Sequence, residues 1–181
     1  MIGQHTECRD TYGPIVVCDP DEMRSEITHG VYTIWKQLCH GREMPSRTDI
    51  APKAFAKFLP HLHLFEVIDF DNFRVRLCGT IMARILGGDT TGAELSASTT
   101  TALGLRTLSV LQRVLIAGRP VLINTERGAA PGTQAHSVES IWLPLSEEGR
   151  SIRHVLSAAS TKVLPEFVNA PIEPQSSSAD A

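Results

Sequence analysis

A regular alternation of apolar and polar positions is clearest over residues 73–78, where three apolar residues alternate with two arginines. A period of two is typical of a strand with one buried and one solvent-facing side. Gly79 ends this pattern, and the spacing over residues 81–86 changes to that of a short helix, with Thr80 placed to cap it and Gly87 to end it. A strand that leads directly into a short helix indicates a mixed α+β domain.

Two longer segments repeat apolar residues every three or four positions, which is the period of an amphipathic helix. The first begins at Asp19 and Pro20, an N-cap and a first-turn proline, with Glu22 completing a capping box, and it ends at Gly41. The second covers residues 103–118 and ends in a glycine. We expect one long helix in each segment.

Dense or alternating apolar runs bounded by turn residues predict the strands. A turn at residues 69–72 joins the first two of them as a hairpin. The predicted strands are residues 61–69, 73–78, 121–126, 135–145 and 151–160.

The pattern divides the chain into four parts. Residues 1–18 show no periodicity and are expected to be a flexible arm, and residues 19–60 form an N-terminal helical extension. The folded domain is expected over residues 61–163. Residues 164–181 are too poor in apolar side chains to offset chain entropy, so a disordered tail is expected there.

Composition narrows the class of protein. Hydrophobic residues make up 42% of the chain, enough for a core, and the net charge of −3 argues against a nucleic-acid partner, which needs a basic surface. The sequence contains neither a secretory signal pattern nor an apolar run long enough to span a membrane. Its four cysteines have no CxxC spacing and are read as free thiols. A cytoplasmic protein is predicted.

Several separate patches of the sequence resemble a bacterial family of stand-alone single-PAS-domain proteins, and the order of predicted elements is similar to the PAS fold. The resemblance implies an α+β fold: a five-stranded antiparallel sheet with helices over one face, here with an added N-terminal amphipathic helix. The patches are Trp35-Lys-Gln-Leu38, Met44-Pro-Ser-Arg47, Leu59-Pro-His-Leu62, Phe73-Arg-Val-Arg-Leu-Cys-Gly-Thr80 and Leu143-Pro-Leu145.

Members of this family are mostly small regulatory or sensory proteins. The resemblance therefore implies a non-catalytic cytoplasmic signalling module that senses a small molecule, acts as a protein-protein interaction adaptor, or does both. Its implied partners are a second copy of the chain and a regulatory protein.

No cofactor is identifiable from the sequence. Flavin-binding PAS proteins carry an Asn-Cys-Arg-Phe-Leu string that is absent here, and residues 90–98 contain no cysteine. Residues 103–118 contain no histidine that could bind haem iron. His61 and His63 supply two ligands where a zinc site needs about four, so no metal site is predicted.

Seven apolar residues are predicted to face the cup between the sheet and the helices. They either complete the core or line a pocket for a small apolar or amphipathic ligand. These candidate ligand-pocket residues are Met82, Ile85, Leu86, Leu108, Leu111, Leu115 and Trp142.

The apolar stripe of the N-terminal helix also has two interpretations, which are compatible with each other. It packs on its own domain, or it forms a homodimer contact. The candidate dimer-interface residues are Met23, Ile27, Val31, Ile34, Trp35 and Leu38.

An alternative function is a small enzyme that uses the apolar cup as its active site. This hypothesis requires a buried titratable group in the cup, for which His136 and Glu139 are the candidates. The sequence shows no catalytic motif, and no catalytic residue is assigned.

Overall fold

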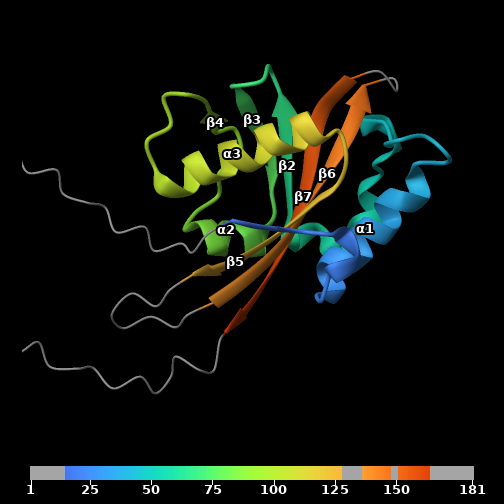
Figure 1. Cartoon of the computed structure of the whole chain (residues 1–181), viewed down its shortest axis with the longest axis horizontal. Coiled ribbons are helices and arrows are strands. Elements are labelled where there is room, and N and C mark those ends of the chain that lie inside the picture. The colour runs from blue at the N-terminus through green and yellow to red at the C-terminus, as the bar shows by residue number, and fades with distance from the viewer. Residues whose placement is uncertain (1–14, 128–135, 148–150, 164–181) are drawn as a thin grey trace, which may run out of the picture.

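The computed structural model describes residues 15–127, 136–147 and 151–163, which form a mixed α+β domain (Figure 1). Its antiparallel sheet has the strand order β1-β5-β6-β7-β2-β3-β4. The strands are β1 Val16–Cys18, β2 Leu62–Val67, β3 Phe73–Cys78, β4 Glu94–Leu95, β5 Val121–Arg127, β6 His136–Glu147 and β7 Ser151–Val163. The α-helices are α1 Glu26–Leu38, α2 Thr80–Leu86 and α3 Ala102–Ala117, and the 3₁₀ helices are η1 Pro20–Glu22, η2 Arg47–Asp49 and η3 Pro52–His61.

The α+β class and the five predicted antiparallel strands are confirmed. Two short strands extend this sheet at its edges. At one edge β1 pairs with β5, with Val16 opposite Asn124, so the last residues of the expected N-terminal arm belong to the sheet. At the other edge β4 pairs with β3, with Leu95 opposite Phe73.

Helices cover both faces of the sheet because successive strand residues point to opposite sides. Leu122 and Ile141 pack against α1 and η3, while their neighbours Ile123 and Trp142 pack in the cluster that contains α3. The α2 and α3 helices lie over the second face, as Figure 1 shows. The helix expected as an N-terminal extension is therefore one layer of the domain.

The start of this helix was predicted too early. Asp19 and Glu22 do form a capping box, but on the short η1 turn, and α1 begins only at Glu26 with Ser25 as its N-cap. The backbone amides of Arg24 and Ser25 instead donate to the side chain of Glu139. Because these amides bond to Glu139, residues 23–25 between η1 and α1 do not continue as a helix.

The junction between β3 and α2 depends on a close backbone approach. Gly79 is the N-cap of α2 and Thr80 is its first residue, so the predicted side-chain cap from Thr80 is wrong. A Cβ atom on Gly79 would lie 2.3 Å from the carbonyl oxygen of Leu59 and 2.5 Å from that of Pro60. Only glycine fits here, which brings η3 against the start of α2.

Candidate functional site

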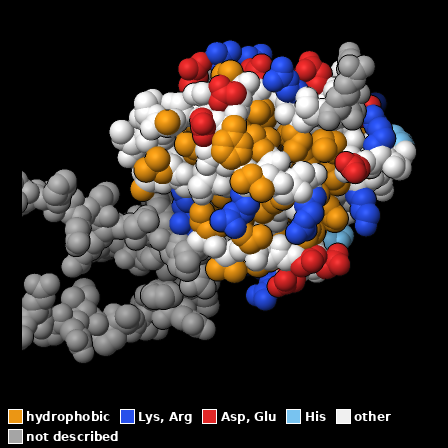
Figure 2. All heavy atoms as spheres, turned by 45° about the horizontal axis from the view of Figure 1, so that its top comes forward, with side chains coloured by type: hydrophobic (Ala, Val, Ile, Leu, Met, Phe, Trp, Pro, Cys, Tyr) orange, Lys and Arg blue, Asp and Glu red, His pale blue; other side chains and the backbone are white. Residues whose placement is uncertain are grey.

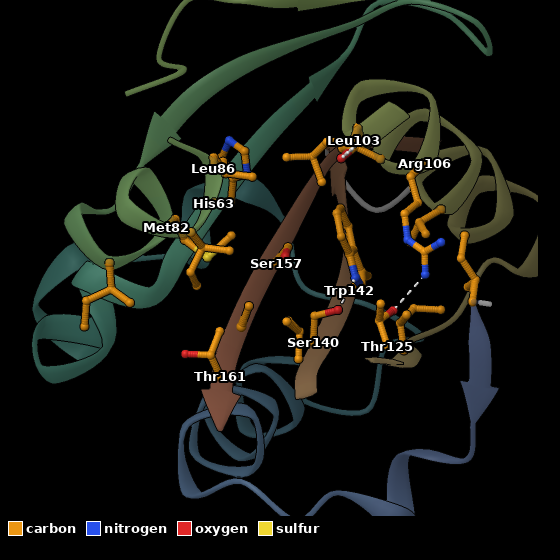
Figure 3. A pocket seen from close by; sticks show the side chains of 18 of the residues that line it. His63, Met82, Leu86, Leu103, Arg106, Thr125, Ser140, Trp142, Ser157 and Thr161 are labelled. Carbon is orange, nitrogen blue, oxygen red and sulfur yellow. Dashed lines mark hydrogen bonds between the residues drawn. The ribbon is translucent and has the colours of Figure 1, made fainter. Parts of the chain in front are cut away.

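A cavity of about 470 Å³ lies between the sheet and the helices α2 and α3 (Figure 3). Ligand cavities in proteins commonly measure roughly 300–1,000 Å³, so this volume suits a small organic molecule. The floor comes from β2, β5, β6 and β7, and the opposite wall comes from the two helices.

Strand register places the floor residues in rows. His63 of β2, Ser157 of β7 and Trp142 of β6 lie directly opposite one another. The next row along the strands holds Ala159 and Ser140. Because strand side chains alternate, every second residue reaches the cavity from Val138 to Trp142 of β6 and from Ser157 to Thr161 of β7.

Trp142 supplies the aromatic part of the floor and is 8% exposed. Its indole Nε1 donates to Ser140 Oγ at 3.0 Å, and its ring stacks on Phe65 with 5.6 Å between centroids. These contacts fix the position of the indole ring, and its N–H group is not available to donate to a ligand.

His63 is the buried titratable group of the cavity, with 4% of its surface exposed. Burial lowers its pKa from the ordinary value to about 4, although the nearby Asp89 carboxylate acts in the opposite direction. The ring is therefore neutral near pH 7, and its Nε2 shares a hydrogen bond of 3.1 Å with Thr90 Oγ1.

Ser157 has a buried hydroxyl that no described group pairs with. The residue is 1% exposed, and its Oγ has no hydrogen-bond partner. Buried polar atoms in proteins are almost always hydrogen-bonded, so an unpaired one at a cavity wall is a place where a water or a bound molecule can supply the partner.

Two arginines line the cavity nearer its edge. Arg84 on α2 is exposed, and Arg106 on α3 is half-buried. The guanidinium of Arg106 donates from Nη2 to Thr125 Oγ1 at 3.0 Å, and Figure 3 shows it pointing toward β5. No Asp or Glu is among the described lining residues.

The seven predicted pocket residues divide into two groups. Met82, Ile85, Leu86 and Trp142 line the cavity, whereas the three candidate leucines on α3, Leu108, Leu111 and Leu115, do not. Thr107 and Val110 are among the α3 residues that line the cavity. Leu108 and Leu111 follow them directly and therefore point roughly 100° away around the helix axis. Leu108, Leu111 and Leu115 instead pack in the core cluster, which is the other interpretation given for these residues.

The polar lining of the cavity is absent from the predicted ligand pocket, because all seven candidate pocket residues are apolar. The alternation of β6 and β7 carried the necessary signal, since Ser140 and Ser157 share a face with Trp142 once the register is known. His63 was considered only as a metal ligand. Its partner in that hypothesis, His61, lies in η3 and its Nδ1 is 3.0 Å from the carbonyl oxygen of Ala159.

The candidate dimer stripe is partly inside the protomer. Val31 is 0% exposed and Trp35 is 4% exposed, with Trp35 Nε1 donating to the carbonyl of Pro144 at 3.0 Å. Both side chains fill the core on the α1 face, as the packing interpretation of the stripe expects. Partly buried members of the stripe pack at the margin of that core and keep some exposed surface; they are Met23, Ile27, Ile34 and Leu38.

Glu139, one candidate of the enzyme hypothesis, points away from the cavity. Its carboxylate accepts from the backbone amides of Arg24 and Ser25, each at 2.9 Å, and from the hydroxyl of Thr28. It therefore anchors the start of α1 on the other face of the sheet. The side chain of His136, the second candidate, lies outside the described residues.

Among residues 15–127, 136–147 and 151–163, no group of three or more His, Cys, Asp and Glu side chains is placed to hold a metal ion. The same search range contains no helix with the length and apolar character needed to cross a membrane.

The fold and its cavity define a PAS-type domain. A family model described as "PAS domain" matches residues 23–158, which is most of the chain, so the protein belongs to the PAS domain family of sensory and signalling modules. None of the curated proteins matches the sequence.

One solved structure, described as "Structure of an RNA-binding Light-Oxygen-Voltage Receptor", shows a distant similarity. It is 19% identical in sequence, with a TM-score of 0.35, over 62% of this chain and 32% of that one. This chain thus spans about a third of that protein, and a TM-score this low supports no conclusion about function.

Proposed function

We propose that the protein is a non-catalytic cytoplasmic signalling module that binds a small molecule in the cavity between its sheet and α2 and α3. The observation that carries this proposal is the Ser157 hydroxyl, which is buried at the cavity floor without a partner. A cup filled only by its own side chains would leave no volume for a ligand, whereas this one leaves about 470 Å³ open.

The connection from the cavity to the rest of the domain runs through β6. Val138 and Ser140 line the cavity, while Glu139 between them faces the other side and holds the amides that precede α1. A ligand that shifts this segment of β6 would change how α1 is held against the sheet. Under this proposal α1 is the element that reports occupancy to a partner.

The proposed partners are a second copy of the chain and a regulatory protein. Figure 2 shows hydrophobic side chains gathered on one face of the molecule, with some basic side chains among them and acidic side chains mostly toward the edge. Contiguous apolar surface of this kind is common at protein contacts. Large exposed hydrophobic residues on the described surface are Val16, Val17, Ile68, Phe70, Leu105 and Ile116.

Native mass spectrometry of the protein purified from its own host tests the proposal. We expect a bound small molecule that is released on denaturation, and an absorption spectrum with neither flavin nor haem bands. A protein that carries no molecule, and to which no small organic compound binds in titration, would contradict the proposed function.

A further inference from the structure

The polar groups around Ser157 already have hydrogen bonds directed elsewhere. On one side Trp142 donates to Ser140, and on the other the Nε2 atom of His63 is bonded to Thr90. Across the cavity the hydroxyl of Thr107 donates to the carbonyl of Leu103 at 2.9 Å. Ser157 Oγ is thus a polar atom at the centre of the floor that is still available to a ligand.

The space in front of Ser157 is apolar. Figure 3 shows Ser157 between Met82 of α2 on one side and Trp142 on the other. Met82 is buried, and Ile85 and Leu86 continue the same helical wall. A molecule in contact with Ser157 therefore rests between aliphatic, thioether and indole surfaces.

The centre of the cavity carries no formal charge near neutral pH. His63 is neutral there because burial lowers its pKa to about 4. The two arginines of the lining lie nearer its edge, since Arg84 is exposed and Arg106 points to Thr125. A charged group at Ser157 would lose its hydration and gain one neutral hydroxyl, which is unfavourable.

From this geometry we propose that the ligand is an uncharged, mainly apolar molecule that places a single hydrogen-bonding atom against Ser157 Oγ and its apolar body between Met82 and Trp142. The inference rests on the proposed function of the same cavity and specifies the chemical class of its ligand. A buried hydroxyl without a partner is unfavourable, so one matched polar atom adds affinity, whereas polar atoms placed against Met82, Ile85 and Leu86 would remain unpaired.

Three probes of similar shape test this ligand class. p-Phenylphenol has one hydroxyl, p-methylbiphenyl replaces that hydroxyl with a methyl group, and p-phenylbenzoate carries a charge. Their dissociation constants are measured by calorimetric titration of the full chain, with competition against p-phenylphenol for the least soluble probe. We expect p-phenylphenol to bind and p-phenylbenzoate to bind at least tenfold more weakly.

Ser157→Ala separates the hydrogen bond from the apolar contacts. It should weaken p-phenylphenol about three- to tenfold, the usual range for one neutral hydrogen bond, and leave p-methylbiphenyl unchanged or tighter. Ser109→Ala on the exposed side of α3 is the matched control and should change neither constant. Circular dichroism of each variant establishes that it is folded.

The ligand class would be overturned if Ser157→Ala weakened both neutral probes equally, or if p-phenylbenzoate bound most tightly of the three. Either result would still show that the cavity binds small molecules. Failure of all three probes to bind also overturns the ligand class. The proposed function is tested separately, by whether any molecule copurifies with the protein.

Discussion

The carboxylate of Glu139 on β6 accepts a hydrogen bond of 2.9 Å from the backbone amide of Ser25, the residue that caps α1. The two residues are 114 positions apart, so this contact joins the N-terminal layer to the centre of the sheet. Since Val138 and Ser140 line the cavity, one strand segment contacts both the cavity and the start of α1.

Removing this anchor should destabilise the domain. Glu139→Ala leaves the amides of Arg24 and Ser25 without their acceptor and is expected to lower the free energy of unfolding by about 2–3 kcal/mol. Urea denaturation measures the change. Glu147→Ala, which removes an exposed ion pair with Arg153, is the control and should cost less than about 1 kcal/mol. Similar losses for both variants would contradict the role given to Glu139.

Acidification should destabilise the protein through His63. Its folded-state pKa is about 4 and its unfolded-state pKa is about 6.5, so the unfolded chain binds more protons between these values. Stability is therefore highest above about pH 6.5 and falls as the pH drops toward 4, by on the order of 3 kcal/mol from this residue. His154, whose pKa is also lowered, mainly by burial, acts in the same direction.

His63→Gln tests this pH dependence, because glutamine does not titrate. The variant is expected to lose stability near neutral pH through lost packing on Phe65, yet to show a smaller further loss on acidification. Urea midpoints at about pH 7 and about pH 4.5 give the comparison. His29→Gln on an exposed position of α1 should keep the wild-type dependence. An unchanged slope in His63→Gln would show that His63 is not the titrating group.

The Gly79 junction gives a prediction with a close internal control. Gly79→Ala places a methyl group against the backbone carbonyls of Leu59 and Pro60, which cannot move as a side chain would, and should cost about 2–3 kcal/mol or more. Gly88→Ala meets no atom within 4 Å and should stay within about 0.5 kcal/mol of wild type. Thermal unfolding of the two variants distinguishes the positions; comparable melting temperatures would argue against a tight junction.

We expect the proposed homodimer to form through the partly exposed residues of the α1 stripe, Met23, Ile27, Ile34 and Leu38. Ile34→Lys places a charge on a half-buried position there and should lower the association constant of the dimer at least tenfold. Light scattering over a range of protein concentrations measures this constant. Gln37→Lys, on an exposed position of the same helix, should associate as wild type does. A monomer mass for the wild-type protein at high concentration would remove the dimer.

Local pattern was sufficient for much of the fold. The alternation at residues 73–78 and the stripe at residues 103–118 correspond to β3 and α3, because each segment buries one face and its period shows directly in the sequence. The hairpin at residues 69–72 followed from its turn residues, and Asn72 does donate to Asp69 there. These features depend on neighbours in the chain.

Features set by distant contacts were not predictable in this way. The start of α1 was misplaced because Glu139, far along the chain, takes the amides that a helix would use. Leu108 and Leu111 were assigned to the pocket because periodicity gives a face of α3 but not its rotation over the sheet. The place of Ser157 in the cavity was missed because it depends on strand register, which puts this residue between His63 and Trp142.

The central claim is that the cavity over Ser157 holds a small molecule, and filling that space tests it most directly. Native mass spectrometry compares wild type with Ser157→Leu, which places a larger apolar side chain on the cavity floor, and with Ser109→Leu, the same change on the exposed side of α3. We predict a bound molecule on wild type and on Ser109→Leu, and its loss from a folded Ser157→Leu. Equal occupancy of all three proteins would contradict the account.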